Sequence, residues 1–115
     1  ESAGDQATAA LLDSGVSIDA IFCASDLIAI GVMRCLKRRG IQVPEQIAVM
    51  GFDDIPAASF ASPGLSTIQQ DTSKAGELLV NNLLKLINNQ PITDTLIEPK
   101  LVVRQSCGAA GSPAN

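Results

Sequence analysis

The residues best suited to chemistry in this sequence are two adjacent carboxylates, Asp53 and Asp54, which directly follow the apolar run IAVMGF. A second polar pair, Ser25 and Asp26, follows another apolar run, DAIFCA. Short apolar runs of this kind are typical of strands buried on both faces of a parallel sheet, and ligands of such sheets bind beyond the carboxyl ends of the strands. If the two strands are neighbours, Ser25 and Asp53 lie at the same edge of the sheet.

A carboxylate and a hydroxyl at one edge of a sheet suit a ligand rich in hydroxyl groups. The Asp53 carboxylate can accept two hydrogen bonds from vicinal hydroxyls, and Ser25 can donate or accept another. This indicates a sugar or nucleoside rather than an anion, because acidic residues repel phosphate and no glycine-rich phosphate loop follows a strand. The pattern alone leaves Asp53 open between a binding role and a turn role. It favours a turn role for Asp54, which precedes Pro56, and a helix-capping role for Asp26.

The composition argues against several classes of function. Twelve acidic and eight basic residues give a net charge of −4, which disfavours nucleic-acid binding by this chain itself. The sequence has no His, and Cys23, Cys35 and Cys107 form no C-x-x-C pair, so the usual zinc ligands and a base for a cysteine nucleophile are missing. No apolar run approaches the ~20 residues that cross a membrane. We therefore predict no catalytic residue, no metal, no cofactor and no membrane contact.

Apolar runs alternate with amphipathic segments along the chain, which predicts an α/β fold with a mainly parallel sheet. Right-handed crossovers place the helices on both faces of such a sheet, giving a three-layer α/β/α sandwich. The expected helices are GDQATAALLDSG and residues 27–39 and 73–88, and the expected strands are residues 19–24, 47–52, 65–70 and 100–104. We predict one domain over residues 1–106 and a flexible tail over residues 107–115.

Several other side chains have a purely structural interpretation. Phe22 and Phe52 lie inside expected strands and are predicted core residues, and Cys23 and Cys35 are predicted to be small buried side chains. The basic triplet at residues 37–39 stands in the last turn of an expected helix, where cations stabilise the carbonyl end of the helix dipole. This favours a role at the helix end over a nucleic-acid patch.

The chain resembles the C-terminal part of the LacI/GalR family of bacterial transcription regulators. The resemblance is carried by three stretches in family order: AIFCASDLIAIGVMRCLKRRGIQVPEQIAVMGFDDIP, SPGLSTIQQDTSKAGELLVNNLLKLI and LVVRQS. It covers residues 4–106, and its specific motifs are A-x-D-x-x-A-x-G, G-x-x-V-P-E and G-F-D-D-I.

The resemblance implies the C-terminal subdomain of a type I periplasmic-binding-protein-like fold. In that fold, two α/β subdomains joined by crossover strands clamp a small effector, usually a sugar or nucleoside. The family also implies a cytoplasmic homodimer whose N-terminal helix-turn-helix reads operator DNA. That helix-turn-helix is not among these 115 residues, so contact with operator DNA is expected only through a part of the protein outside them.

The resemblance also implies roles for individual residues in effector binding. Asp53 matches the family aspartate that hydrogen-bonds effector hydroxyls. Ser25 stands where many sugar-binding members have Asn, so its contact is expected to be weaker or made to a different group. Gln70 and Thr72 match positions that approach the effector from the hinge side.

The family further implies two docking surfaces. Phe60, Ile30 and Met33 lie on the segments through which family members dimerise; we expect an interface role for Phe60, and leave Ile30 and Met33 open between the interface and the core. The helix at residues 73–88 packs in the family on an N-terminal subdomain that is not among these residues. We therefore expect its apolar face to pack against a second copy or to fold back differently.

Two other functions compete with a regulator. One is a periplasmic sugar-binding protein of a transport or chemotaxis system, which the V-P-E element disfavours. The other is a phosphoacceptor that uses Asp53, which would need an acidic pair after an earlier strand and a lysine after a later one. The first expected strand ends in a single acid, and no lysine follows the third strand before Lys74 in the helix, so this second function is also disfavoured.

Overall fold

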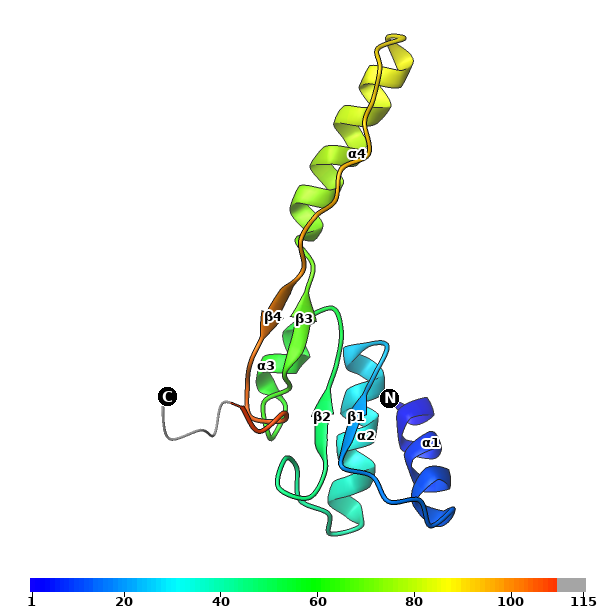
Figure 1. The fold of residues 1–115 in the computed structure, drawn as a ribbon, viewed down its shortest axis with the longest axis vertical. Coiled ribbons are helices and arrows are strands. Elements are labelled where there is room, and N and C mark those ends of the chain that lie inside the picture. Colours follow the sequence, from blue (N-terminus) through cyan, green and yellow to red (C-terminus); the bar gives the residue numbers. More distant parts are fainter. Residues whose placement is uncertain (110–115) are drawn as a thin grey trace. The chain divides into compact units, whose positions relative to one another are not determined.

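The computed structural model describes residues 1–109, which form two compact units, Glu1–Gln69 with the segment from Leu101, and Gln70–Lys100. Figure 1 shows the elements in chain order. They are α1 (Ser2–Asp13), β1 (Ala20–Phe22), α2 (Asp26–Arg38), β2 (Ala48–Met50), α3 (Pro56–Phe60), β3 (Thr67–Gln69), α4 (Thr72–Ile87) and β4 (Lys100–Val102). No helix among the described residues is long and apolar enough to cross a membrane.

The first two strands of the first unit run parallel, as predicted. β1 and β2 lie side by side (Figure 1), and they pair in register with Ile21 opposite Val49. Two isolated parallel bridges join the β2 segment to the β3 segment. One lies between Met50 and Ser66, and the other lies between Asp53 and Gln69. β3 in turn pairs with β4. The α/β class with parallel pairing is thus confirmed, although each strand is three residues long and shorter than expected.

The core forms where α2 packs on this parallel strand pair. Ser25 caps α2 by accepting a hydrogen bond from the Ile28 backbone nitrogen at 3.3 Å, and the helix ends at Arg38, just before Gly40 with its φ of +73°. The buried apolar side chains are Cys23, Ala29, Val32, Met33, Cys35, Leu36, Ile47, Val49, Ala58 and Leu65. The prediction that Cys23 and Cys35 are buried is therefore confirmed.

The prediction that Phe22 belongs to the core is wrong. Its side chain is 61% exposed, whereas the neighbouring Ile21 packs against the core. The reason is the two-residue period of a strand, which turns Ile21 and Phe22 to opposite faces of the sheet. Phe22 and Met50 line a shallow cavity of about 270 Å³. The strand is therefore buried on one face only, whereas its apolar sequence predicted burial on both faces.

The basic triplet at the end of α2 is explained largely by α1. Arg39 pairs with Asp13 at 2.7 Å, and Arg38 pairs with Asp5. The hydrogen bond from Arg38 lowers the pKa of the Asp5 carboxyl below its ordinary value, and Arg39 does the same for the pKa of Asp13. These ion pairs are exposed and contribute little stability, but they give two of the three cations an acidic partner. Their presence agrees with the structural interpretation of the triplet.

The two helices also approach closely at a glycine. A Cβ on Gly4 of α1 would lie 2.1 Å from the carbonyl oxygen of Ile28, in the first turn of α2. The obstacle is backbone rather than a flexible side chain, so a larger residue would push α1 away from α2.

Replacing Gly4 by Ala should therefore destabilise the first unit by about 1–3 kcal/mol, the usual cost of overpacking. The measurement is the free energy of unfolding from urea denaturation. Gly76→Ala is the matched control, because nothing lies within 4 Å of a Cβ at this position in α4. That control should be neutral or slightly stabilising, as expected for Ala in a helix. Equal stability of the Gly4→Ala variant and the parent chain would contradict the close approach.

The second unit consists mainly of α4. Asp71 caps this helix by accepting a hydrogen bond from the Lys74 backbone nitrogen at 2.9 Å, and no residue of α4 is buried. Leu79, Leu83 and Ile87 are 70%, 58% and 67% exposed. That this apolar face packs against a second copy or folds back differently remains a prediction.

The C-terminal end of the described chain belongs to the first unit. Ser106 is fully buried, and the Gly108 backbone nitrogen bonds the Gln105 carbonyl at 3.2 Å. The predicted flexible tail falls mostly on residues 110–115, which lie outside the described residues.

Candidate functional site

The carboxyl ends of β1 and β2 meet at one edge of the sheet, as the sequence predicts. The Asp26 backbone nitrogen donates to the Phe52 carbonyl at 2.9 Å, and this bond sets the Ser25–Asp26 pair beside the residues that follow β2. The Asp53 backbone nitrogen donates to the Ile68 carbonyl at 2.8 Å and so joins the same edge to the third strand. Ser25 and Asp53 therefore stand at the same end of the sheet.

Asp53 presents a free carboxylate at this edge. Its side chain is exposed, and it makes no hydrogen bond or ion pair with another residue of the described chain. Its φ of +115° lies in a region that L-residues other than glycine rarely adopt. A residue held in this way with an unpaired acceptor is suited to binding a ligand that donates hydrogen bonds.

Asp54 differs sharply from its neighbour, because it is tied down on both carboxylate oxygens. Arg104 forms an ion pair with one oxygen at 2.9 Å, and the Gln69 side-chain amide donates to the other at 2.9 Å. The side chains of Asp54 and Arg104 are 12% and 20% exposed. The structure therefore agrees with the prediction that Asp54 stabilises the turn, and it supplies partners that the sequence did not reveal.

Asp26 is a buried crosslink rather than a simple cap. Its side chain is 0% exposed, accepts from the Thr67 hydroxyl at 2.6 Å and accepts from the Ile55 backbone nitrogen at 2.8 Å. Ser25 supplies the cap instead. The carboxylate of Asp26 thus joins the start of α2 to the loop after β2 and to β3, and it is not available to a ligand.

Ser25 can still donate one hydrogen bond to a ligand. Its oxygen accepts from the Ile28 backbone nitrogen, and the side chain is only partly buried. A serine hydroxyl has one proton to donate besides its acceptor lone pairs, so this group can still donate to a ligand oxygen.

Gln70 and Thr72, the other predicted effector residues, belong to the second unit. Both side chains are exposed, and Thr72 is the first residue of α4. The effector roles of Gln70 and Thr72 remain predictions from the family resemblance.

The Cys23 thiol and the potential metal ligands are the remaining groups with possible chemistry. Burial, together with the nearby Asp26 carboxylate, raises the pKa of the Cys23 thiol to about 11. This thiol is therefore protonated at neutral pH, and a protonated thiol is a poor nucleophile. No group of three or more potential metal ligands is present among residues 1–109.

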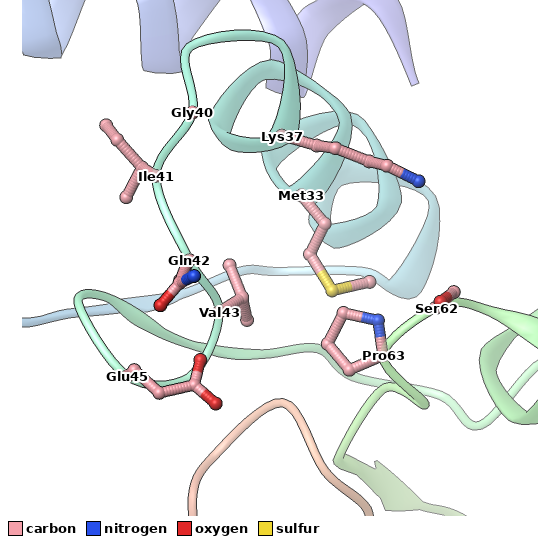
Figure 2. A pocket seen from close by; sticks show the side chains of 9 residues that line it. All are labelled: Met33, Lys37, Gly40, Ile41, Gln42, Val43, Glu45, Ser62 and Pro63. Atoms are coloured by element: carbon pink, nitrogen blue, oxygen red, sulfur yellow. The ribbon is translucent and has the colours of Figure 1, made fainter.

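The predicted dimer residues differ in how much surface they offer. Phe60, at the end of α3, is 84% exposed, whereas Met33 is 6% exposed and belongs to the core, and Ile30 is partly buried against it. A cavity of about 480 Å³ adjoins Met33, and Figure 2 shows it between the end of α2, the following loop and the Ser62–Pro63 turn. Its lining residues are Met33, Lys37, Gly40, Ile41, Gln42, Val43, Glu45, Ser62 and Pro63. Of these candidates, Phe60 has the most surface to give a partner.

Sequence reasoning missed three residues that shape the site, namely Thr67, Gln69 and Arg104. Each acts through a partner far away in the sequence, and no local motif announces such a contact. The available signal was weak: Arg104 is an isolated cation next to an apolar strand, and Thr67 and Gln69 stand two residues apart on β3, where they share one face.

Comparison with known proteins agrees with this architecture. Residues 1–107 match the family of periplasmic binding protein-like domains. The chain is 39% identical over 89 residues to the ribose operon repressor of Haemophilus influenzae, covering 76% of this chain and 27% of that protein. It is 37% identical over 109 residues to the transcriptional regulator MalR of Streptomyces coelicolor, covering 93% of this chain and 31% of that protein.

Solved structures give the same result. The crystal structure of the Lac repressor dimer bound to operator and the anti-inducer ONPF superposes with a TM-score of 0.87 at 34% identity, covering 91% of this chain and 37% of that one. Fold, edge site and relatives together define a periplasmic-binding-protein-like domain of regulatory type. The chain belongs to the LacI/GalR family of transcription regulators and corresponds to the C-terminal part of their effector-binding region. It spans 27–31% of the length of the two curated relatives named above.

Replacing Asp26 by Ala should destabilise the first unit by about 3 kcal/mol or more, because the buried Thr67 hydroxyl and the partly buried Ile55 backbone nitrogen would lose a charged acceptor. Urea denaturation measures this free energy. Thr67→Val is the graded comparison, since it removes only one of the two hydrogen bonds and should cost about half as much. An Asp26→Ala variant as stable as the parent chain would show that this carboxylate does not hold the edge together.

Proposed function

We propose that this chain is the effector-sensing and dimerisation portion of a bacterial transcription regulator. Its effector is a small sugar or nucleoside that alters operator affinity, and operator DNA is bound by a helix-turn-helix outside these residues. The observation that carries the proposal is the exposed, unpaired carboxylate of Asp53 at the edge of a parallel sheet, in a chain whose relatives are named as regulators. The proposed protein is cytoplasmic and is not an enzyme.

In the proposed binding mode, Asp53 accepts hydrogen bonds from effector hydroxyls and Ser25 donates one to an effector oxygen. Gln70 and Thr72 contact the effector from the hinge side. A neutral polyol fits these groups better than an anion does, because the edge carries an unpaired negative charge. The other half of the site lies on an N-terminal subdomain of the longer polypeptide, which also covers the apolar face of α4.

Replacing Asp53 by Ala in the full-length regulator should weaken effector binding by about 1.5–3 kcal/mol, a factor of roughly 10 to 150. A thermal-shift screen of sugars and nucleosides finds the ligand, and titration calorimetry then gives the affinities. Asp19→Ala is the matched control, because Asp19 is an exposed aspartate at the other end of β1. An unchanged affinity in the Asp53→Ala variant would refute the role of Asp53.

The dimer surface is proposed to centre on Phe60. The Phe60 side chain is 84% exposed, so a partner has almost the whole ring to bury, and aromatic residues are enriched among interface hot spots. Ile30 and Met33 offer less surface, since Ile30 is partly buried and Met33 belongs to the core.

Replacing Phe60 by Ser in the full-length protein should shift the monomer–dimer equilibrium toward monomer by at least about tenfold, because the truncated anchor no longer buries its ring. Sedimentation equilibrium measures the dissociation constant. Leu11→Ser serves as the control, since Leu11 is also an exposed apolar side chain but lies on α1. Equal dissociation constants for the parent and the Phe60→Ser variant would rule out this surface.

A further inference from the structure

The residue after Asp53 holds together both chain segments that connect the two units. Asp54 binds Gln69 through one carboxylate oxygen and Arg104 through the other, each at 2.9 Å. Gln69 is the last residue of the first unit before the chain passes into the second unit, and Arg104 follows β4, where the chain has returned. We call these three residues, Asp54, Gln69 and Arg104, the clasp.

The clasp is anchored in the core beneath it. Arg104 also donates from its guanidinium to the Leu65 carbonyl at 2.8 Å, and its backbone nitrogen donates to the Ser66 hydroxyl at 2.8 Å. Leu65 and Ser66 are both fully buried. These contacts fix the position of the Arg104 guanidinium. The ion pair therefore sets the position of the Asp54 carboxylate, and not the reverse.

The backbone around the clasp explains why such a fixed partner is needed. Both Asp53 and Asp54 have positive φ, +115° and +57°, a backbone region that residues other than glycine adopt only at a cost in strain. The backbone bond from Asp53 to Ile68 and the weak contact from the Asp54 nitrogen to the Thr67 hydroxyl, at 3.4 Å, hold one side of this turn. The ion pair with Arg104 holds the other side.

We propose that Asp54 and Arg104 are positioning residues for Asp53, and that Gln69 completes the clasp. The clasp keeps the Asp53 backbone in its strained conformation, so that the Asp53 carboxylate faces outward from the sheet edge. Because its three residues lie on the strand end and on both connecting segments, a shift of Asp53 on binding a ligand pulls directly on those segments. This inference rests on the proposed function for its link to ligand binding, but the conformation of Asp53 can be tested without any ligand.

The first experiment measures amide hydrogen exchange and the HN–Hα coupling of Asp53 by NMR in the present chain. Asp54→Asn and Arg104→Gln should each speed exchange of the Asp53 amide by about tenfold or more and change its coupling constant, since local opening becomes easier. Arg104→Lys keeps a cation and should restore most of the protection. The Val49 amide, which bonds Ser106 in the core, reports global unfolding and should change far less than that of Asp53.

Asp19→Asn is the matched control for the loss of one exposed carboxylate, and it should leave the Asp53 amide unchanged. Equal exchange and coupling at Asp53 in the parent chain and in Asp54→Asn would overturn the proposal. So would parallel changes at Asp53 and Val49, because these would show a purely global effect on stability.

The second experiment titrates the full-length regulator with D-ribose and adenosine as probes with vicinal hydroxyls. Asp54→Asn and Arg104→Gln should weaken binding of the bound probe by about tenfold, and Arg104→Lys should recover most of it. Unchanged affinity together with altered exchange at Asp53 would overturn the link between the clasp and binding. If neither probe binds the parent protein, that result counts against the proposed function, and the exchange measurement alone decides on the clasp.

Discussion

The edge of the sheet depends on the buried carboxylate of Asp26. This group lies between three segments that are distant in the sequence, and it accepts one hydrogen bond from the loop after β2 and another from Thr67 on β3. It also stands in the first turn of α2, where a negative charge is stabilised by the helix dipole. A buried charge is tolerated only when its oxygens are bonded, and here each oxygen has a donor. Even the glycine opposite is required, because a Cβ on Gly51 would lie 2.3 Å from this carboxylate.

The sequence predicted the elements of this edge better than the contacts between them. Apolar runs followed at once by polar pairs placed Ser25 and Asp53 at strand ends, and parallel pairing then had to bring those ends together. The same reasoning failed for Phe22, because successive side chains of a strand point to opposite faces and the face that carries Phe22 is exposed. The ion pair between Asp54 and Arg104 could not be predicted, since it joins residues 50 positions apart and depends on the path of the returning strand.

The second unit does not bury the apolar face of its own helix, α4. A 16-residue helix without buried residues gains little from packing within its own unit, and isolated helices of that length are only marginally stable in water. Leu79, Leu83 and Ile87 would each gain about 1.5–3 kcal/mol on full burial. A surface able to cover them would therefore stabilise α4 by more than its capping by Asp71 does, since a cap contributes about 1 kcal/mol. We propose the N-terminal subdomain of the regulator as this surface.

The two adjacent acids have opposite roles, and electrostatics explains why both can be present. Two neighbouring carboxylates on a strained turn repel each other, which would open the turn if neither were neutralised. Arg104 compensates the charge of Asp54 in a partly buried ion pair, while Asp53 keeps its charge in contact with water. A cation shared by both carboxylates would occupy part of the acceptor capacity of Asp53 and compensate part of its charge. The pairing of Arg104 with Asp54 alone therefore leaves the Asp53 carboxylate as the group at this edge best placed to accept hydrogen bonds from a neutral, hydroxyl-rich molecule.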